Sequence, residues 1–246
     1  MLKKRNSSNR TGTVAIIPAA GSGVRMGSDR AKQFMEIDGR PLLAATLKTF
    51  ENCRTIDAVI VVVPAKDVGY CRKEIIAKFK MSKVRKVVPG GKRRQDSVRL
   101  GLEAAEEGYE LALIHDGVRP VISAKAIERI IDAAKTHGAV ITGIPAKETV
   151  KEVDGKQVVV RTYDRKRMWL VQTPQVFPYE DLLAVHRKAL DEGWAEATDD
   201  SVLIEKLGIP VKVLEGSERN IKVTTPNDLE LAKFYLRDTE NIGNPT

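Results

Sequence analysis

The residues best suited to chemistry follow the first apolar run of the chain, residues 13–17. Gly21 and Gly23 come soon after that run, and two cations, Arg25 and Lys32, flank the glycine turn. A glycine turn at the end of a buried strand brings backbone N–H groups close to a phosphate, because glycine has no Cβ and tolerates positive φ. Glycines with flanking cations therefore predict a site for a nucleoside triphosphate.

The spacing of the glycines separates this turn from two common phosphate loops. The dinucleotide-binding fingerprint needs G-x-G-x-x-G, whereas residues 21–27 read G-x-G-x-x-x-G. A Walker A loop needs four residues between its glycines and then Lys-Ser/Thr, and no such run exists. The glycines alone would also fit a plain tight turn, and it is the cations that favour phosphate binding.

A second glycine pair lies in segment 89–97, which reads Pro-Gly-Gly-Lys-Arg-Arg-Gln-Asp-Ser. Gly90 and Gly91 precede a predicted helix and again offer N–H groups to an anion. Arg94 and Ser97 are within reach of the same ligand. The basic residues here would equally suit a solvated surface, so both interpretations stand.

Asp116 ends the apolar run that begins at Leu111. A carboxylate there is a natural Mg²⁺ ligand, because this ion usually takes one or two carboxylates plus substrate phosphates. Capping of the next turn is the alternative. Arg119 offers a forked donor to a second phosphate. Lys222 alternates with apolar neighbours as on a half-buried strand, where it either projects over a nucleotide or lies on the surface.

The inventory of reactive groups favours phosphoryl or nucleotidyl transfer. The sequence has no G-x-S-x-G motif and no plausible Cys–His pair. Glycine turns, a few cations and one carboxylate are what an enzyme needs when it mainly positions groups and neutralises charge. The three histidines are far apart and lack metal-ligand spacing.

The elements that must position these residues alternate between strand-like and helix-like segments. Most strand-like runs are continuous and apolar, which is typical of strands buried on both faces of a parallel sheet. We therefore expect an α/β fold with a mainly parallel, Rossmann-like sheet, which binds ligands at the carboxyl ends of its strands. The runs are 14–17, 58–63, 84–88, 111–115, 139–144, 169–172 and 211–214.

Helix signals lie between and after these runs. Ser123 is a predicted N-cap for a helix with an apolar face. Thr225-Pro226 is a cap with a proline at the first helical position, and Leu229, Leu231 and Phe234 are expected to be buried. Residues 198–200, Thr-Asp-Asp, open another helix.

Residues 147–167 depart from this rhythm. They are highly charged, and Asp154-Gly155 is a strong hairpin-turn signal. A two-stranded hairpin is marginal alone, so it should pack on something. Two interpretations are open: the segment is a solvent-exposed loop, or it is an arm at a subunit interface.

Composition sets broad limits on the class of protein. The 246 residues carry a net charge of +8, which fits anionic partners such as phosphorylated metabolites. Only 5% of residues are aromatic, so we expect no nucleic-acid partner, and no apolar run reaches the roughly 18 residues of a membrane span. Residues 1–12 are expected to be a disordered basic tail rather than a secretory signal. Two cysteines without C-x-x-C spacing suit a reducing compartment, so we expect a cytoplasmic protein.

Taken together in order, the motifs closely resemble the 2-C-methyl-D-erythritol 4-phosphate cytidylyltransferase family of the non-mevalonate isoprenoid pathway. The resemblance runs from about residue 13 to 237. It rests on Pro18-Ala-Ala-Gly-Ser-Gly-Val-Arg-Met26, Lys32-Gln-Phe34, Gly90-Gly91 with Asp96-Ser97-Val98, His115-Asp-Gly-Val-Arg-Pro120, Thr173-Pro-Gln175 and Asn220-Ile-Lys-Val-Thr224.

This resemblance implies a nucleotidyltransferase fold in a single domain over residues 13–237, followed by a flexible tail, 238–246. It implies CTP and a polyol phosphate as substrates and Mg²⁺ as cofactor. It also implies a homodimer in which the 147–167 arm reaches the partner's active site, which favours the interface interpretation of that segment.

The resemblance also implies roles for individual residues. The catalytic cations would be Arg25, Lys32 and Lys222, and the metal ligand Asp116. The CTP site would comprise Ala19, Ala20, Gly21, Gly23, Gly91, Ser97 and Gly117. The methylerythritol-phosphate contacts would be Arg119, Thr149, Arg165, Thr173 and Thr198, with Arg165 coming from the partner subunit.

Two departures from the family pattern concern the substrate. Lys92 stands where many members carry Asp, and Gly117-Val118-Arg119 stands where Ala-Ala-Arg is usual. The related ribitol-5-phosphate cytidylyltransferases often show Val before that arginine, so they are the alternative function. Segments 145–150 and 163–169 look more like the methylerythritol enzymes. A non-catalytic nucleotide-binding protein is the alternative of another class, but it would be free to lose Lys32 or Asp116, and both are present.

Overall fold

The computed structural model describes residues 11–21, 31–106 and 108–242, and the side chains within that part up to residue 238. Two residues of the expected nucleotide site, Gly23 and Arg25, lie outside the described residues, as does most of the expected N-terminal tail. The last helix continues to Ile242, past the domain end expected at residue 237.

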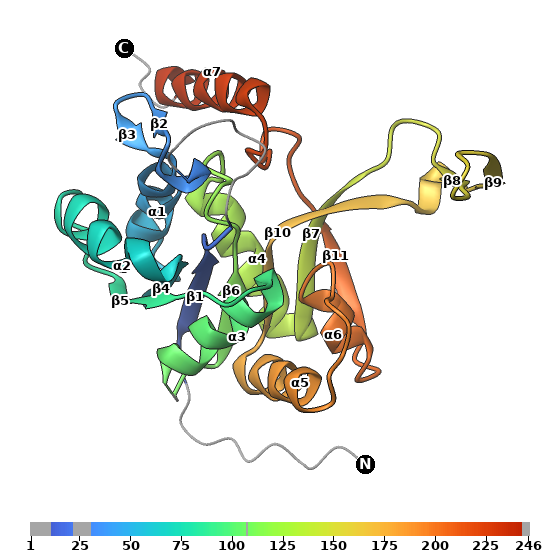
Figure 1. Ribbon diagram of the computed structural model, residues 1–246, viewed down its shortest axis with the longest axis horizontal. Helices are drawn as coiled ribbons and strands as arrows, with labels where there is room; N and C mark the ends of the chain where they lie inside the picture. Colours follow the sequence, from blue (N-terminus) through green and yellow to red (C-terminus); the bar gives the residue numbers. More distant parts are fainter. Residues whose placement is uncertain (1–10, 22–30, 107, 243–246) are drawn as a thin grey trace.

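A seven-stranded sheet forms the centre of the molecule (Figure 1). Neighbouring strands are parallel except for the tenth strand, which runs antiparallel to both of its neighbours. The spatial order is β11 (Val211–Glu215), β7 (Ala139–Pro145), β10 (Trp169–Pro178), β6 (Leu111–Ile114), β1 (Thr13–Pro18), β4 (Ala58–Val63) and β5 (Val84–Pro89). All seven predicted strands are present, and the fold is of the expected mainly parallel α/β class.

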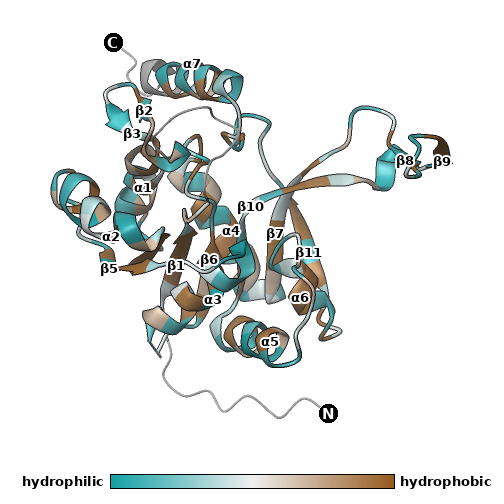
Figure 2. Ribbon diagram, viewed as in Figure 1, coloured by the Kyte–Doolittle hydropathy of each residue, from teal (hydrophilic) through white to brown (hydrophobic). Residues whose placement is uncertain are grey.

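The central strands read as continuous apolar runs because helices cover both faces of the sheet (Figure 2). Ala15 and Ile17 of β1 point into one layer, packed by helices α1 (Leu42–Asn52) and α4 (Ala124–His137). Val14 and Ile16 point into the other layer. That layer contains α3 (Arg94–Ala105), α5 (Tyr179–Asp191) and α6 (Ser201–Glu205).

Short elements complete the first layer. A helical stretch joins β4 to β5, comprising a 3-10 turn Ala65–Asp67, α2 (Val68–Tyr70) and a π-helical segment Cys71–Ala77. A 3-10 turn, Lys32–Phe34, precedes a small hairpin of β2 (Glu36–Ile37) and β3 (Arg40–Pro41). No helix in the described part of the chain is long and apolar enough to cross a membrane.

Helix α7 (Pro226–Ile242) packs beside the small hairpin. Its predicted cap is confirmed, since Thr225 Oγ1 accepts a hydrogen bond from Asp228 N at 3.2 Å. Leu229 is buried as expected. The expectation for Leu231 and Phe234 is wrong, because these side chains are 41% and 63% exposed.

The charged segment forms the predicted hairpin. Strand β8 (Lys151–Val153) pairs with β9 (Val159–Thr162) around the turn at Asp154-Gly155, and a 3-10 turn, Arg165–Arg167, leads back to β10. Figure 1 shows this arm standing out from the body of the molecule. The predicted Ser123 cap is also confirmed, because Ser123 Oγ accepts from Ala126 N at 3.2 Å.

Candidate active site

A cavity of about 170 Å³ opens at the carboxyl ends of β1, β5 and β6. Ligands of open parallel sheets bind at this edge. Six residues from the first half of the chain that were expected to bind the nucleotide or to act as catalytic cations line the cavity: Ala19, Ala20, Gly21, Lys32, Gly91 and Ser97. The structure thus brings together residues that are up to 78 positions apart in the sequence.

Residues 90 and 91 must be glycine because other atoms lie too close to leave room for a Cβ. A Cβ on Gly90 would lie 2.3 Å from Ala20 Cβ, and one on Gly91 would lie 2.3 Å from Asp96 Cβ. Gly91 N donates to Ser97 Oγ at 3.2 Å. Ser97 was expected to contact the nucleotide, and in this structure it also holds the glycine loop in shape. The loop is therefore held against the end of β1, as phosphate binding by backbone N–H groups requires.

Gly117 is a packing residue in this structure. Its N–H donates to Pro18 O at 3.1 Å, and a Cβ there would lie 2.9 Å from Ala19 Cβ and 3.0 Å from Leu43 Cδ1. It is buried behind the cavity wall, whereas its neighbours Asp116 and Val118 line the cavity. Glycine at 117 lets the strand end lie directly against the first glycine turn.

A second cavity, of about 260 Å³, adjoins the first. It contains three of the expected acceptor contacts, Arg119, Thr173 and Thr198. Three side chains line both cavities: Arg94, Asp116 and Lys222. Lys222 lies on a loop rather than on the predicted strand, yet it reaches the site as expected.

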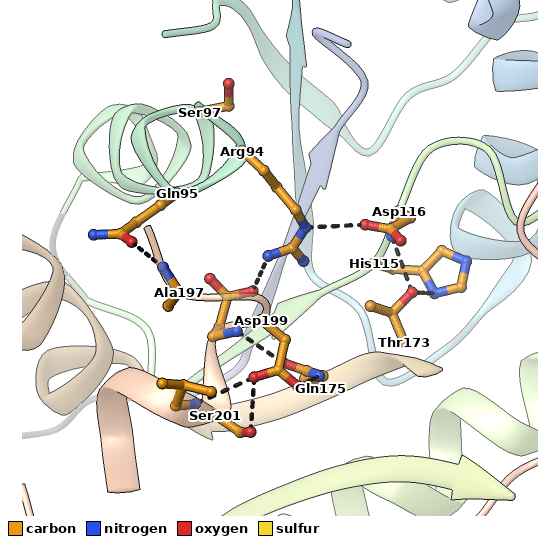
Figure 3. A network of polar contacts seen from close by, with 12 residues as sticks. Arg94, Gln95, Ser97, His115, Asp116, Thr173, Gln175, Ala197, Asp199 and Ser201 are labelled. Carbon is orange, nitrogen blue, oxygen red and sulfur yellow. Dashed lines mark hydrogen bonds and ion pairs between the residues drawn. The ribbon is translucent and has the colours of Figure 1, made fainter. Parts of the chain in front are cut away.

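Asp116 is the charged centre of the two cavities. Its Oδ1 accepts from Arg94 Nε at 3.2 Å (Figure 3). Its Oδ2 lies 2.9 Å from Lys222 Nζ and 3.5 Å from Arg119 Nε. Burial raises the pKa of this carboxyl, but the charges of Arg94, Lys222 and Arg119 outweigh burial and hold the pKa well below its usual range. Asp116 is therefore ionised at neutral pH.

A buried histidine fixes the backbone on either side of Asp116. His115 contacts Thr173 Oγ1 through Nδ1 at 3.2 Å and Arg119 O through Nε2 at 3.0 Å. Thr173 Oγ1 also accepts from Asp116 N at 3.1 Å. Burial lowers the pKa of His115 to about 4, so the ring is neutral at pH 7. Thr173 thus supports the carboxylate as well as lining the second cavity.

The structure adds contacts that the sequence interpretation did not predict. Arg94 Nη1 donates to Asp200 Oδ2 at 2.8 Å, and Asp200 Oδ1 contacts His186 Nε2 at 3.1 Å. Gln175 Oε1 accepts from Asp200 N at 3.3 Å. The Asp pair at 199–200 was visible as a helix start, but nothing in the sequence links it to Arg94, which is 106 positions away.

The two expected acceptor contacts on the arm do not join these cavities. Thr149 and Arg165 line neither of them, and Arg165 Nη1 instead donates to Lys147 O at 2.8 Å. Both lie on the segment that projects from the body (Figure 1). Within one chain they cannot complete the site.

The donor set was compared with what Mg²⁺ needs. No group of three or more His, Cys, Asp or Glu side chains that would hold a metal is present among the described residues. Asp116 is a single ionised carboxylate on the wall of both cavities, which fits the mode in which Mg²⁺ takes one carboxylate and completes its shell with substrate phosphates and water. The side chain of Lys222 is 41% exposed, so it can move away from Asp116 without leaving solvent.

The fold and the site define a class of protein. A mainly parallel sheet carries glycine loops at its carboxyl edge, and two adjoining cavities meet at one carboxylate among cations. This is an α/β nucleotidyltransferase, an enzyme that moves a nucleotidyl group between two phosphorylated molecules.

Comparison with known proteins gives the family. The family model described as 2-C-methyl-D-erythritol 4-phosphate cytidylyltransferase matches residues 13–238, and the chain belongs to this family. The enzyme of that name from Syntrophus aciditrophicus is 46% identical over 227 residues, covering 92% of this chain and 97% of the relative. That from Caldanaerobacter subterraneus subsp. tengcongensis is 41% identical over 223 residues, covering 91% and 98%.

Solved structures agree with this assignment. The crystal structure of 4-diphosphocytidyl-2C-methyl-D-erythritol synthase from Anaerococcus prevotii has a TM-score of 0.81 and 37% identity, covering 92% of this chain and 96% of that one. The 2-C-methyl-D-erythritol 4-phosphate cytidylyltransferase from Francisella tularensis has a TM-score of 0.78 and 31% identity, covering 91% and 99%. The chain is a cytidylyltransferase of isoprenoid biosynthesis.

Proposed function

We propose that the chain transfers CMP from CTP to the phosphate of 2-C-methyl-D-erythritol 4-phosphate and releases pyrophosphate. The observation that carries this proposal is the pair of adjoining cavities that share Arg94, Asp116 and Lys222. The first cavity, with its glycine loops and Lys32, suits the nucleotide. The second, with Arg119 and two threonines, suits a phosphorylated polyol.

The reaction is an in-line displacement at the α-phosphorus of CTP. An oxygen of the acceptor phosphate forms a bond to that phosphorus, while the bond from the α-phosphorus to the bridging oxygen breaks and pyrophosphate leaves with the electron pair. No covalent intermediate with the enzyme is needed. The chain's contribution is to place the two phosphates together and to supply positive charge from Lys32, Lys222 and, in the part outside the described residues, Arg25.

The cofactor of this reaction is proposed to be Mg²⁺, held by Asp116 together with oxygens of the CTP phosphates. The bound ion would neutralise charge on the triphosphate. Lys222 and Arg94 contact the carboxylate that would hold the ion, and both would then be available to substrate phosphates. Asp116 would thus pair with Arg94 and Lys222 before the substrate binds, and with the metal ion afterwards.

The active unit is proposed to be a homodimer with exchanged arms. The arm and the adjoining start of β10 carry apolar side chains that a monomer leaves exposed: Val153, Val158, Val159, Val160, Trp169, Leu170 and Val171. Contiguous exposed apolar surface marks an interaction site. An arm laid across a second copy would bring Arg165 and Thr149 to the partner's second cavity, where a guanidinium fork suits the acceptor phosphate.

The proposed location is the cytoplasm. Cys53 and Cys71 are both free and buried, and burial raises the pKa of the Cys71 thiol to about 12. Buried, unpaired and protonated thiols fit a reducing compartment, where disulfides are rare.

The experiment that tests the reaction is pyrophosphate release. The chain is supplied with CTP and Mg²⁺ and with either methylerythritol phosphate or ribitol 5-phosphate. We expect release that depends on methylerythritol phosphate, with ribitol phosphate at least about 100-fold poorer in kcat/KM. Such a ratio is about 2.7 kcal/mol and is within what hydrogen bonds to substrate hydroxyls supply. Faster release with ribitol phosphate would overturn the acceptor assignment.

A further inference from the structure

A larger hollow lies apart from the two substrate cavities and is lined by residues of α1, α4, α7 and the segment after β11. Its volume is about 430 Å³. That is within the range of small-molecule sites in proteins. Among the described residues, none that lines this hollow lines either substrate cavity, so it is a separate place in the molecule.

The lining combines an apolar wall with basic side chains. Val121, Ile122 and Leu236 contribute to the wall. Four cations also line the hollow: Arg40, Lys48, Arg129 and Arg219. Arg219 is already paired with Asp238, which lies outside the lining, and no acidic side chain is among the described lining residues. Ser123, the N-cap of the 14-residue helix α4, opens onto the same space, which adds the positive end of a helix dipole. The chemistry is complementary to an anion with an apolar body.

One lining residue carries a buried polar atom without a partner. Asn220 lines the hollow and is only 2% exposed. Its Nδ2 donates to Thr173 O at 2.7 Å, but its Oδ1 has no hydrogen-bond partner in the described part of the chain. A buried acceptor without a donor is costly.

The backbone of Asn220 connects this hollow to the active site. Asn220 O accepts from Arg119 Nη1 at 2.7 Å, and Lys222, two residues further on, contacts Asp116. We propose that the hollow binds a small amphiphilic phosphate monoester, and that its occupancy adjusts the segment carrying Asn220 and Lys222. The binding stands apart from the proposed reaction, whereas an effect on turnover would rest on it.

The test is calorimetric titration of the full chain with octyl phosphate, without CTP. We expect saturable binding of one octyl phosphate per chain, with inorganic phosphate and octanol each at least about tenfold weaker, because each has only half of the required chemistry. Vesicles containing phosphatidylglycerol serve as a further arm. Binding to vesicles without binding of monomeric octyl phosphate would overturn the proposal in favour of a lipid surface.

Variants locate the binding. Ala126→Leu fills the hollow from the first turn of α4 and should abolish binding. Lys48→Glu reverses an exposed lining charge and should weaken binding about tenfold or more. Lys78→Glu makes the same charge change outside the hollow and should leave binding unchanged.

Three results would overturn the proposal. Octyl phosphate could fail to bind the unaltered chain, or Lys48→Glu could bind like Lys78→Glu. A Lys32→Ala change that weakens binding as much as Lys48→Glu would place the anion in the nucleotide cavity. Lys48 is on the surface, so its variant keeps the test decisive even where Ala126→Leu disturbs folding. Because no turnover is measured, a chain without the proposed activity would still give the expected binding.

Discussion

At the scale of single residues, the site depends on one carboxylate that three cations keep charged. Asp116 lies within 3.5 Å of Arg94, Lys222 and Arg119, and it is 6% exposed. An isolated charge could not remain ionised there, because burial penalises the charged form. The same arrangement leaves a hard oxygen ligand facing both cavities.

Asp116→Asn should therefore raise the Mg²⁺ requirement. An amide oxygen is a poorer ligand for a hard cation than a carboxylate, so we expect the Mg²⁺ concentration for half-maximal turnover to rise at least about tenfold. Excess metal should restore part of the activity. Asp191→Asn, at an exposed position of α5, is the control. An unchanged metal titration would mean that Asp116 only holds the surrounding cations.

His115 should make folding stability depend on pH. Burial lowers its pKa to about 4, below the ordinary value near 6.5, so the unfolded chain binds the proton more readily. Stability is then complete above pH 6.5 and is lost as the pH falls from 6.5 towards 4. Between pH 7 and 4.5, the free energy of unfolding should fall about 2–3 kcal/mol more for the unaltered chain than for His115→Asn.

Urea denaturation at several pH values measures this difference. The exposed His137 supplies the matched variant, His137→Asn, which removes an imidazole and leaves the buried ring of His115 in place. Equal pH slopes for the chain with and without His115 would contradict the assignment of a buried neutral ring.

At the scale of elements, the glycine loop at residues 90–91 is placed by the packing of α3 on the sheet. Gly101 lies where the helix meets β1 and β4, and a Cβ there would be 2.5 Å from Ile16 Cγ2 and 2.9 Å from Val62 Cγ2. The helix therefore approaches these strands more closely than any other residue would allow. Arg94 and Ser97, at the start of the same helix, take their positions from this contact.

Gly101→Ala should destabilise the fold by about 1–3 kcal/mol, the range for overpacking a core. Gly69 in α2 is the matched control, because a Cβ there meets nothing within 4 Å. Gly69→Ala should be neutral or stabilise by about 0.4–1 kcal/mol through the unfolded chain. Denaturant unfolding of both variants is the measurement. A Gly101→Ala variant as stable as Gly69→Ala would show that the helix can move away freely.

The same elements show what the sequence could and could not predict. Apolar runs predicted all seven strands, since a buried strand depends on local composition. The direction of β10 was not local information: the strand enters from the arm and runs antiparallel to β6 and β7. The exposed Leu231 and Phe234 fit a helical period but face away from the body, which the period alone cannot reveal.

Part of the site could likewise be predicted from the sequence, and part could not. The glycine turns and Asp116 were predicted because each follows a strand and therefore lies at the same edge of the sheet. Arg94 with Asp200, and Asn220 with Arg119, are joined only by folding, at separations of 106 and 101 residues. No spacing rule reaches across such distances.

At the scale of the whole molecule, the body holds the two cavities, and the arm carries the remaining expected contacts away from them (Figure 1). In a two-fold dimer each site would take Lys32 from one chain and Arg165 from the other. We propose that each active site is assembled in this way from two chains.

The most direct measurement is the turnover of mixed dimers. Lys32→Ala removes a cation from the nucleotide cavity, and Arg165→Ala removes the phosphate fork from the arm; each should inactivate its own homodimer, by about 10²–10³-fold for Lys32→Ala. When the two are mixed and subunit exchange is confirmed, one site receives both defects and the other none. We predict that each heterodimer recovers about half of normal turnover. No recovery after confirmed exchange would mean that Arg165 serves its own chain, and the assembly of each site from two chains would be wrong.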